Sequence, residues 1–461
     1  MKTDILIIGA GLTGLTTAFT LASKGKNVQI LERMERPGGQ ILTHNEDGFT
    51  FESGPNTGSI SNPEVAELFV ELEKISGGKC KLETAPDAAK RRLIWKGDKF
   101  HALPSGLGSA ISTPLFTLGD KFRILGEPWR KKGENPDESI AELTRRRLGK
   151  SFVDYAVDPF LSGVYAGDPN TLITRYALPK LYNLEQNYGS FVRGAMKKAK
   201  EPKTDRDRLA TKKVFSAVGG LSNITKAMSD YLGDRITLGI KNLKITPMGS
   251  GWMASFTDKD GNTQSINALQ VVTTCGSYVL PEILPFIEPS MMQKINNLKY
   301  APMVEVSVGI KNTNGLNYKA FGGLVPTCEH KQILGILFPS ACFTGRAPEE
   351  GALFSYFIGG VKHQEMIEKS DSELTTIVED VFHEMLKFPK NVNPDLIKIF
   401  RHQHAIPQYE ITTGERLAAV EQIEKQFNGL HIAGNLRDGI GMAHRIKQAR
   451  DIANQCIMHN A

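Results

Sequence analysis

The sequence of 461 residues predicts an α/β fold in which a dinucleotide-binding domain is interrupted by inserted domains. A strand, a glycine turn, a helix, a second strand and an acid follow one another over residues 5–32. A further strand, glycine-rich turn and helix occupy residues 429–457, and the segment between passes from a mainly helical to a strand-rich pattern. Because the two ends would build one domain, we expect the middle of the chain to form inserted domains.

The N-terminal segment predicts a Rossmann-like unit. An apolar run at residues 5–8 leads into the turn Gly9-Ala10-Gly11-Leu12-Thr13-Gly14, and a second apolar run ends at Glu32. In such a turn the first glycine permits a tight bend, the second lets backbone approach a pyrophosphate, and the third lets the helix pack on the strand. The helix expected over residues 12–24 directs its positive end at the phosphates, and Glu32 can accept hydrogen bonds from a ribose diol.

A second glycine pair narrows the dinucleotide to FAD. Gly38 and Gly39 follow the ribose acid closely, and Gly54-Pro55-Asn56 comes soon after. At the other end, Gly434-Asn435 and Gly439-Ile440-Gly441-Met442 lie between the last predicted strand and the last predicted helix. Together these segments resemble the FAD-binding amino-oxidase superfamily, in which backbone at the glycine pair passes along the diphosphate and the ribityl chain.

The resemblance implies FAD as the cofactor, and the pattern of elements divides the chain into five segments. The FAD-binding domain takes residues 1–75, 204–285 and 405–461; a mainly helical segment with substrate cavity and membrane contact takes 76–203, and a substrate-binding α+β segment takes 286–404. The residues assigned to FAD are Gly9, Gly11, Leu12, Thr13, Gly14, Glu32, Arg33, Gly38, Gly39, Gln40, Gly54, Pro55, Asn56, Asn242, Gly434, Asn435, Gly439, Ile440, Gly441 and Met442.

The composition is that of an ordinary enzyme, with a charged fraction of 23% and a net charge of +6. The five cysteines show neither a CxxC pair nor metal-ligand spacing, so we expect a reducing compartment, no disulfide framework and no metal site. Met1–Asp4 leads directly into the first strand, and no apolar run is long enough to span a bilayer. We therefore expect no signal peptide and a cytoplasmic protein, free or peripheral on the inner face of the membrane.

Three basic clusters, at residues 130–132, 145–147 and 193–213, are expected to be solvated helix faces. The alternative is attraction to anionic lipid or to an acidic substrate. Aromatic residues do not interleave with these charges, and no binding motif accompanies them, so nucleic acid is not an expected partner.

Residues 104–132 combine apolar side chains, such as Ile111, Phe122 and Trp129, with lysines and arginines. An amphipathic helix at a lipid interface has this pattern, and so does a helix that covers a substrate cavity. Both interpretations stay open at this point. The sequence also leaves open whether the chain forms a homodimer.

Blocks in the middle of the chain carry a narrower resemblance. Residues 158–169 (DPFLSGVYAGDP), 188–194, 322–326, 333–338 and 405–409 resemble, in the same order, the oxygen-dependent protoporphyrinogen oxidase family. The likeness implies six-electron oxidation of protoporphyrinogen IX to protoporphyrin IX by O₂, with release of H₂O₂, in heme biosynthesis. Oxidation of coproporphyrinogen III is the alternative, and another flavin amine oxidase, a desaturase or a tetrapyrrole carrier is less favoured.

The same resemblance assigns the substrate residues. Arg92 matches an arginine that grips a substrate propionate through two parallel hydrogen bonds, and its neighbour Arg91 is the competing candidate. Leu324, Leu337 and Phe357 match apolar positions that clamp the pyrrole rings. We name no catalytic base, because the flavin takes the hydride and pyrrole protons can leave to water.

The remaining candidates have structural alternatives. Gly167 is expected to approach the flavin or the macrocycle closely, or to be a simple loop glycine. The acids Asp158, Asp168 and Glu185 are expected to have structural roles, since the first two precede prolines in turn-like segments. His404 is expected to be a packed or surface histidine.

Overall fold

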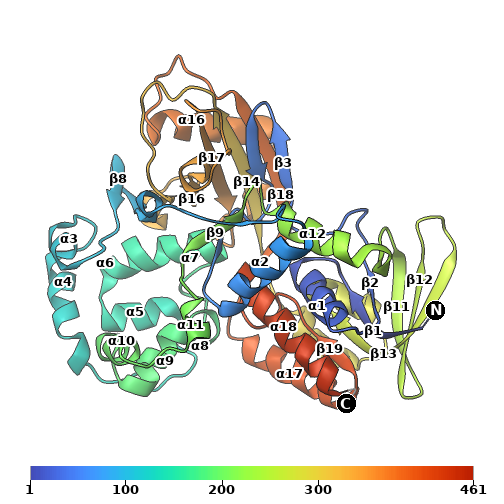
Figure 1. Ribbon diagram of the computed structural model, residues 1–461. Coiled ribbons are helices and arrows are strands. Elements are labelled where there is room, and N and C mark those ends of the chain that lie inside the picture. Colours follow the sequence, from blue (N-terminus) through green and yellow to red (C-terminus); the bar gives the residue numbers. More distant parts are fainter. Residues whose placement is uncertain (1, 460–461) are drawn as a thin grey trace.

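Two seven-stranded sheets and a helical lobe make up the computed structural model, which describes residues 2–459 (Figure 1). Residues 1, 460 and 461, the outermost positions of the two terminal predicted segments, lie outside the described residues. Both termini lie in the part of the molecule that contains the first sheet. In Figure 1 the second sheet lies above the first, and the helical lobe lies beside the two sheets.

The first sheet joins the two ends of the chain. β1 pairs in parallel with β2 and β13, and β13 pairs in parallel with β19 near the C-terminus. The predicted α/β class is confirmed by this arrangement. Four helices form an apolar core with one side of this sheet: α1 (Leu12–Ser23), α2 (Pro63–Ile75), α12 (Ser222–Leu232) and α18 (Met442–His459). The strands, in spatial order, are β10 (Ile236–Thr237), β2 (Val28–Leu31), β1 (Lys2–Ile8), β13 (Thr263–Thr273), β12 (Gly251–Thr257) and β11 (Lys241–Met248), with β19 (Leu430–Ile432) beside β13.

The second sheet carries helix α16 (Asp371–Glu384) on one face, where both form an apolar core. Its strands, in spatial order, are β18 (Leu396–Pro407), β14 (Tyr300–Ile310), β17 (Ala352–Gly359), β16 (Gly335–Leu337), β15 (Gly322–Leu324), β7 (Arg92–Lys96) and β8 (Lys99–Ala102). The hairpin β7–β8 differs from the mainly helical pattern expected after residue 86. It turns at Gly97, whose φ is +67°, and β7 is stabilised by parallel pairing with the distant β15.

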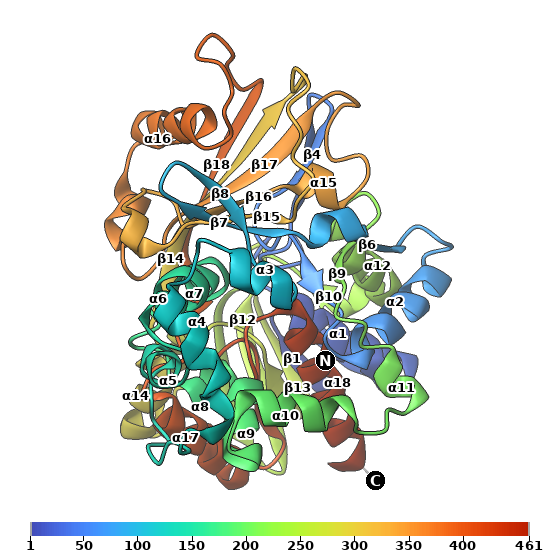
Figure 2. The same ribbon diagram turned by 90° about the vertical axis from the view of Figure 1, so that its left-hand side faces the viewer.

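The helical lobe faces the viewer on the left of Figure 2. Its helices are α3 (Leu107–Ser112), α4 (Leu118–Leu125), α5 (Ile140–Arg147), α6 (Lys150–Phe152), α7 (Asp158–Tyr165), α8 (Thr174–Ala177), α9 (Pro179–Tyr188) and α10 (Phe191–Ala199). The amphipathic segment expected over 104–132 is not one helix. It breaks at Pro114 and again at Gly126, so that α3, α4 and a 3-10 turn at Glu127–Trp129 follow one another.

Short elements complete the description. A three-stranded sheet contains β5 (Gly58–Ser59), β9 (Val214–Ala217) and β6 (Leu82–Thr84), and a hairpin contains β3 (Thr43–Glu46) and β4 (Phe49–Glu52). The remaining α-helices are α11 (Asp205–Arg208), α13 (Leu280–Ile283), α14 (Pro289–Asn296), α15 (Pro339–Cys342) and α17 (Thr413–Gln426).

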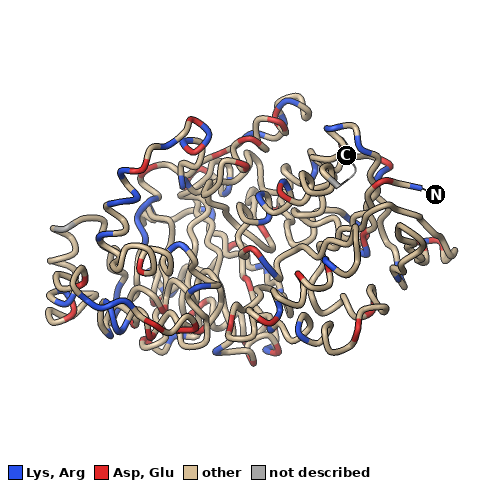
Figure 3. Tube along the Cα trace, turned by 90° about the horizontal axis from the view of Figure 1, so that it is seen from below, with Lys and Arg blue, Asp and Glu red and all other residues tan. Residues whose placement is uncertain are grey.

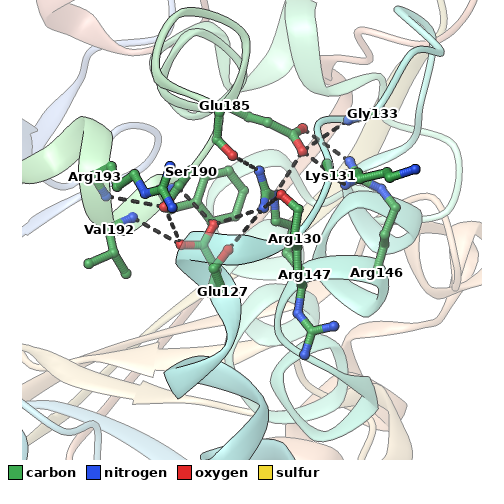
Figure 4. A network of polar contacts seen from close by, with 12 residues as sticks. Glu127, Arg130, Lys131, Gly133, Arg146, Arg147, Glu185, Ser190, Val192 and Arg193 are labelled. Atoms are coloured by element: carbon green, nitrogen blue, oxygen red, sulfur yellow. Dashed lines mark hydrogen bonds and ion pairs between the residues drawn. The ribbon is translucent and has the colours of Figure 1, made fainter.

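A buried charge network holds the helical lobe together (Figure 4). Arg147 of α5 is fully buried and forms ion pairs of 3.2 Å with Glu127 and 2.8 Å with Glu185 of α9. Glu127 also accepts hydrogen bonds from Ser190 and from the first backbone N–H groups of α10. Arg146 adds a second pair to Glu185 at 2.9 Å. Glu185 therefore has the structural role expected of it.

This network corrects the interpretation of the basic cluster at 145–147. Arg147 does not lie on a solvated face, because two carboxylates from other elements surround it inside the lobe. The local sequence shows only three consecutive arginines, whereas the two carboxylates that pair with Arg147 come from residues 127 and 185. Figure 3 shows Lys and Arg interspersed with Asp and Glu along most of the trace.

Candidate functional site

The glycine turn and the ribose acid meet at the carboxyl end of β1. The Glu32 carboxylate accepts hydrogen bonds from the backbone N–H of Ala10 at 2.6 Å and of Met34 at 2.8 Å. These bonds fix the acid directly against the turn that precedes α1. The arrangement places a carboxylate beside a helix N-terminus, where a ribose and its attached phosphate would lie.

The second glycine pair lies on the first. Gly38 donates its N–H to the Ala10 carbonyl at 2.8 Å, and a Cβ built on Gly39 would come within 3.0 Å of the Gly11 Cα. Arg36 holds this loop, since its guanidinium donates to the carbonyls of Gly39 and Ile41. Two segments that are separated in sequence by α1 and β2 therefore form one backbone surface.

The glycines of the turn test whether a dinucleotide fits. A Cβ on Gly14 would lie 1.9 Å from the Gly9 carbonyl oxygen, so this position is closed by the protein's own packing. A Cβ on Gly11 would meet no atom within 4 Å, although the backbone there is ordinary, with φ −75° and ψ −177°. The open space at Gly11 is where a pyrophosphate would lie, and the residues present fit the group.

The C-terminal turn reaches the same region. Gly434 lies against β13, because a Cβ there would come within 2.9 Å of the Thr274 carbonyl oxygen, and Thr274 bonds the end of β1. Arg445 and Gln448 of α18 hold the turn through the Gly434 carbonyl and N–H. Tyr409 ties the next stretch together by donating to the Asn435 carbonyl and accepting from the Gly439 N–H.

The other residues assigned to FAD fall in four segments of the chain, at 12–13, 33–40, 54–56 and 440–442. Leu12 and Thr13 are buried in the first turn of α1, Arg33 and Gln40 are exposed beside Glu32 and Gly39, and Gly54 lies against the Gln40 carbonyl. Pro55 and Asn56 continue from Gly54, and Ile440 and Gly441 lead into α18. Met442 is buried and packs toward Gly58.

Asn242 is not brought to this site. It lies on the outer strand β11, where its exposed side chain donates to Thr257 Oγ1. The residue that does reach the ribose acid is Ile240, whose backbone N–H donates to the Glu32 carbonyl at 3.2 Å. Sequence reasoning missed Ile240, because the pairing of β10 with β2 is a long-range contact that no local pattern signals.

The face of the second sheet opposite α16 carries the predicted substrate residues. Directly paired residues on neighbouring strands point to the same side of a sheet. One cross-strand row runs through Ile94, Leu324, Gly335, Phe357 and Glu305, and the next runs through Arg92, Gly322, Leu337, Ser355 and Ser307. We call the side that bears these two rows the open face.

The exposure pattern singles out the same residues. Leu324, Leu337 and Phe357 are half-exposed, whereas the strand residues that flank each of them are mostly buried. The chain therefore leaves three large apolar side chains partly exposed in the interior part of the sheet. Such a patch suits a flat apolar ligand.

The register also bears on the two arginines. Arg92 pairs with Gly322 and so lies on the open face, with its guanidinium 5.6 Å from the Phe321 ring centroid. Arg91 lies one residue earlier, just before the strand begins. Because side chains alternate between the two faces along a strand, the position of Arg91 belongs to the opposite face. Both are exposed, but only Arg92 shares a row with Leu337.

Gly167 has a packing role in the structure. A Cβ there would lie 2.6 Å from Gln408 Oε1 and 2.9 Å from Leu172. The turn after α7 is therefore tightly packed against residues that do not belong to the open face. The glycine that does touch the open face is Gly163, where a Cβ would come within 2.5 Å of Leu324 Cδ2. The sequence signal for Gly163 was its place in the same block, one helical turn earlier.

The remaining candidates have local partners. Asp158 accepts a hydrogen bond from the Thr327 N–H at 2.7 Å and pairs with Lys362, so it joins α7 to the second sheet. Asp168 accepts from the Asn170 N–H at 2.9 Å in a turn. His404 is exposed and stacks on Tyr278 with ring centroids 4.1 Å apart.

The chain is similar to proteins of known kind along almost its whole length. A model of the family described as flavin containing amine oxidoreductase matches residues 12–456. Protoporphyrinogen oxidase 1, chloroplastic, of Arabidopsis thaliana is 31% identical over 479 residues, covering 98% of this chain and 88% of that protein. Coproporphyrinogen III oxidase of Bacillus subtilis is 24% identical over 485 residues, covering 99% and 98%.

Solved structures share the fold. A protein of Exiguobacterium sp. 255-15, provisionally assigned as a protoporphyrinogen oxidase, superposes with a TM-score of 0.80 at 22% identity, covering 98% of each chain. A reduced UDP-galactopyranose mutase superposes with a TM-score of 0.73 at 16% identity, covering 100% of this chain and 95% of that one.

Proposed function

We propose that this chain, which belongs to the flavin-containing amine oxidoreductase family and takes FAD as its cofactor, oxidises a porphyrinogen with O₂ and releases H₂O₂. The observation that carries the proposal is the open face, which Arg92 shares with partly exposed Leu324, Leu337 and Phe357. A porphyrinogen has apolar pyrrole rings and peripheral propionates, and the open face offers a counterpart to each.

The residues of the chain divide the work. Bound FAD would supply the acceptor for a hydride, which carries two electrons and one proton. Leu324, Leu337 and Phe357 hold the macrocycle by apolar contact, and the Arg92 guanidinium orients it through a propionate. Leu115 and Phe116 pack with Ile94 and Leu324 over one end of the open face, which excludes water there.

Protoporphyrinogen IX is the proposed substrate, and coproporphyrinogen III is the alternative. Relatives at 24–31% identity include several proteins named for the first compound and a protein named for the second. The two substrates differ in two vinyl groups against two propionates. The experiment is a comparison of kcat/KM for both porphyrinogens with H₂O₂ release as the readout. A higher kcat/KM for coproporphyrinogen III would make it the substrate in place of protoporphyrinogen IX. Turnover of an amine, with no turnover of either porphyrinogen, would overturn the proposal.

We also propose that the helical lobe contacts an anionic membrane surface. Ile111, Leu118, Phe122, Leu125 and Trp129 are each at least 65% exposed, an unusual set of large apolar side chains on one short stretch. Residues 104–132 therefore fit a lipid contact as well as a cover over a substrate cavity. Leu115 and Phe116 are buried inside the protein, whereas these five side chains face outward. No helix within residues 2–459 is long and apolar enough to cross a membrane.

Liposome co-sedimentation tests the membrane contact. With anionic vesicles at low salt, the protein is expected to sediment, and Phe122→Glu with Trp129→Glu is expected to release it. The control is Leu269→Glu, which changes another side chain that is 53% exposed, on β13 of the first sheet. Equal sedimentation of all variants, or none by the parent protein, would contradict the proposal.

A further inference from the structure

Glu305 is an acid inside the second sheet that the mechanism above does not use. It lies on β14, is 2% exposed, and pairs directly with Phe357 on β17. Its side chain therefore belongs to the open face, in the same cross-strand row as Leu324. A buried carboxyl in an otherwise apolar strand requires a partner or a function.

The first partner comes from the FAD-binding domain. Asn56 donates its side-chain amide to Glu305 Oε1 at 2.5 Å and to the Gly54 carbonyl at 3.0 Å. Ser355, on the neighbouring row of the open face, donates to Asn56 Oδ1 at 2.7 Å. Two residues of the second sheet thus hold the carboxamide of the segment 53–56.

A continuous path of contacts leads from the pyrophosphate position to Glu305. Gly39 lies on Gly11, Gln40 follows Gly39, and a Cβ on Gly54 would lie 2.1 Å from the Gln40 carbonyl oxygen. Asn56 then joins Gly54 to Glu305. Bound FAD must extend in this direction, because its phosphates belong at Gly11 and its ring must reach a ligand on the open face to accept a hydride.

The second oxygen of Glu305 has no partner in the protein. Within residues 2–459 no hydrogen bond reaches Oε2, and no cation pairs with the carboxylate. Burial raises the pKa of the Glu305 carboxyl well above its usual range, the Asn56 hydrogen bond opposes this, and the charge of Glu52 adds to it. Burial therefore favours the protonated form of this carboxyl, and a protonated carboxyl has one O–H to donate.

The charged groups around Glu305 are paired with other residues. Glu52 is itself paired with Arg346 at 3.0 Å, and Lys398 on β18 pairs with Glu46 at 2.6 Å. His402, on the same side of β18, has its pKa lowered by burial, so it is uncharged beside the sheet at neutral pH. β17 contributes Ser355 and Phe357 to this side, neither of which titrates.

We propose that Glu305 is a protonated acid whose Oε2 hydroxyl donates a hydrogen bond to the ring system of bound FAD, and that this bond favours reduction of the cofactor. A flavin gains negative charge when it accepts a hydride, and a donor placed beforehand stabilises that charge. Asn56 is a positioning residue, because it holds the carboxyl without meeting the reacting atoms. The inference rests on the FAD cofactor of the family and on the proposed function's placement of the substrate on the open face, and it holds for either porphyrinogen.

The experiment measures the reduction potential and the visible spectrum of the FAD-loaded protein, without porphyrinogen, over a range of pH. Glu305→Leu removes the donor, and its potential is expected to lie below that of the parent protein. Glu305→Gln keeps an acceptor for Asn56 and a donor for the flavin but cannot ionise. Its potential is expected to match the parent protein at low pH and to lie increasingly above it as the Glu305 proton is lost at higher pH.

Ser355→Ala is the matched control. It removes a hydrogen bond to Asn56 on the same face but leaves the titrating carboxyl, so it is expected to follow the parent protein with pH. The inference is overturned if Glu305→Leu leaves potential and spectrum unchanged, or if Glu305→Gln follows the parent protein over the whole pH range. Failure to oxidise a porphyrinogen would overturn the proposed function alone, because no porphyrinogen enters this measurement.

Discussion

Gly39 packs directly against Gly11: a Cβ on Gly39 would lie 3.0 Å from the Gly11 Cα, while Gly11 itself faces open space. The two glycine motifs therefore form a single backbone surface with room on one side. The different surroundings of the glycines give each a distinct expected response to substitution.

Replacing Gly11 by valine is expected to give folded but colourless protein. The backbone at Gly11 suits any residue, and nothing in the protein meets its Cβ within 4 Å, so the valine side chain obstructs only the pyrophosphate. The measurements are far-UV circular dichroism for the fold and flavin absorbance for the cofactor. Retention of yellow colour would contradict the placement of FAD.

Gly14→Ala is the contrasting variant. Its Cβ would lie 1.9 Å from the Gly9 carbonyl oxygen, so α1 must move away from β1. Overpacking of this kind costs about 1–3 kcal/mol, and a lowered melting temperature of the FAD-free protein is expected. Gly11→Val should leave that temperature nearly unchanged.

Arg92→Ala is expected to keep the yellow colour and to weaken substrate binding. A hydrogen bond to a charged group contributes about 1.5–3 kcal/mol, so KM should rise roughly 10- to 100-fold while kcat changes less. Arg92→Lys should recover part of the loss, since it keeps the charge but not the two-point geometry. Arg91→Ala is the control, and a larger effect there than at Arg92 would reverse the assignment.

Arg147→Met is expected to destabilise the helical lobe by about 3–5 kcal/mol, because it leaves Glu127 and Glu185 buried without their shared cation. Thermal or urea unfolding followed by tryptophan fluorescence measures the effect. Lys150→Ala breaks an exposed pair with Asp154 and should change stability by less than about 1 kcal/mol. Equal effects of the two substitutions would show that the buried network does not hold the lobe.

The pH dependence of stability should differ between the parent protein and Glu305→Gln. The pKa of Glu305 is raised in the folded protein, so below the ordinary carboxyl value of 4.5 the acid is protonated whether folded or unfolded. As pH rises toward the raised value, the unfolded chain ionises first, and the fold loses stability. Glutamine cannot ionise, so the melting temperature of Glu305→Gln should gain on the parent protein with increasing pH. A constant difference would contradict burial of an uncompensated carboxyl.

Local patterns predicted the parts of the site that are local. The turn from Gly9 to Gly14 and Glu32 lie within one strand–helix–strand unit, and Glu32 bonds the turn as its spacing indicates. Pairing between β10 and β2, which local sequence does not encode, brings the Ile240 backbone to the acid, whereas Asn242 bonds Thr257. The hairpin β7–β8 was hidden for the same reason, since its partner β15 lies more than two hundred residues away.

Glu305 shows what sequence alone could not reveal. The only signal was a single acid within the apolar run of residues 300–310, a pattern equally typical of a solvent-facing strand position. Its burial depends on Asn56 and Ser355, which come from two other parts of the chain. The open face was likewise predicted as separate residues, and only the strand register shows that Leu324 and Phe357 share one row with Glu305.

The most direct test of the account is anaerobic mixing of the FAD-loaded protein with protoporphyrinogen IX or coproporphyrinogen III, followed by flavin absorbance. The account predicts that the flavin band bleaches with at least one of the two, and that admission of O₂ restores it with formation of H₂O₂. Binding of both porphyrinogens without any bleaching would contradict the account and leave the protein as a flavoprotein that carries tetrapyrroles.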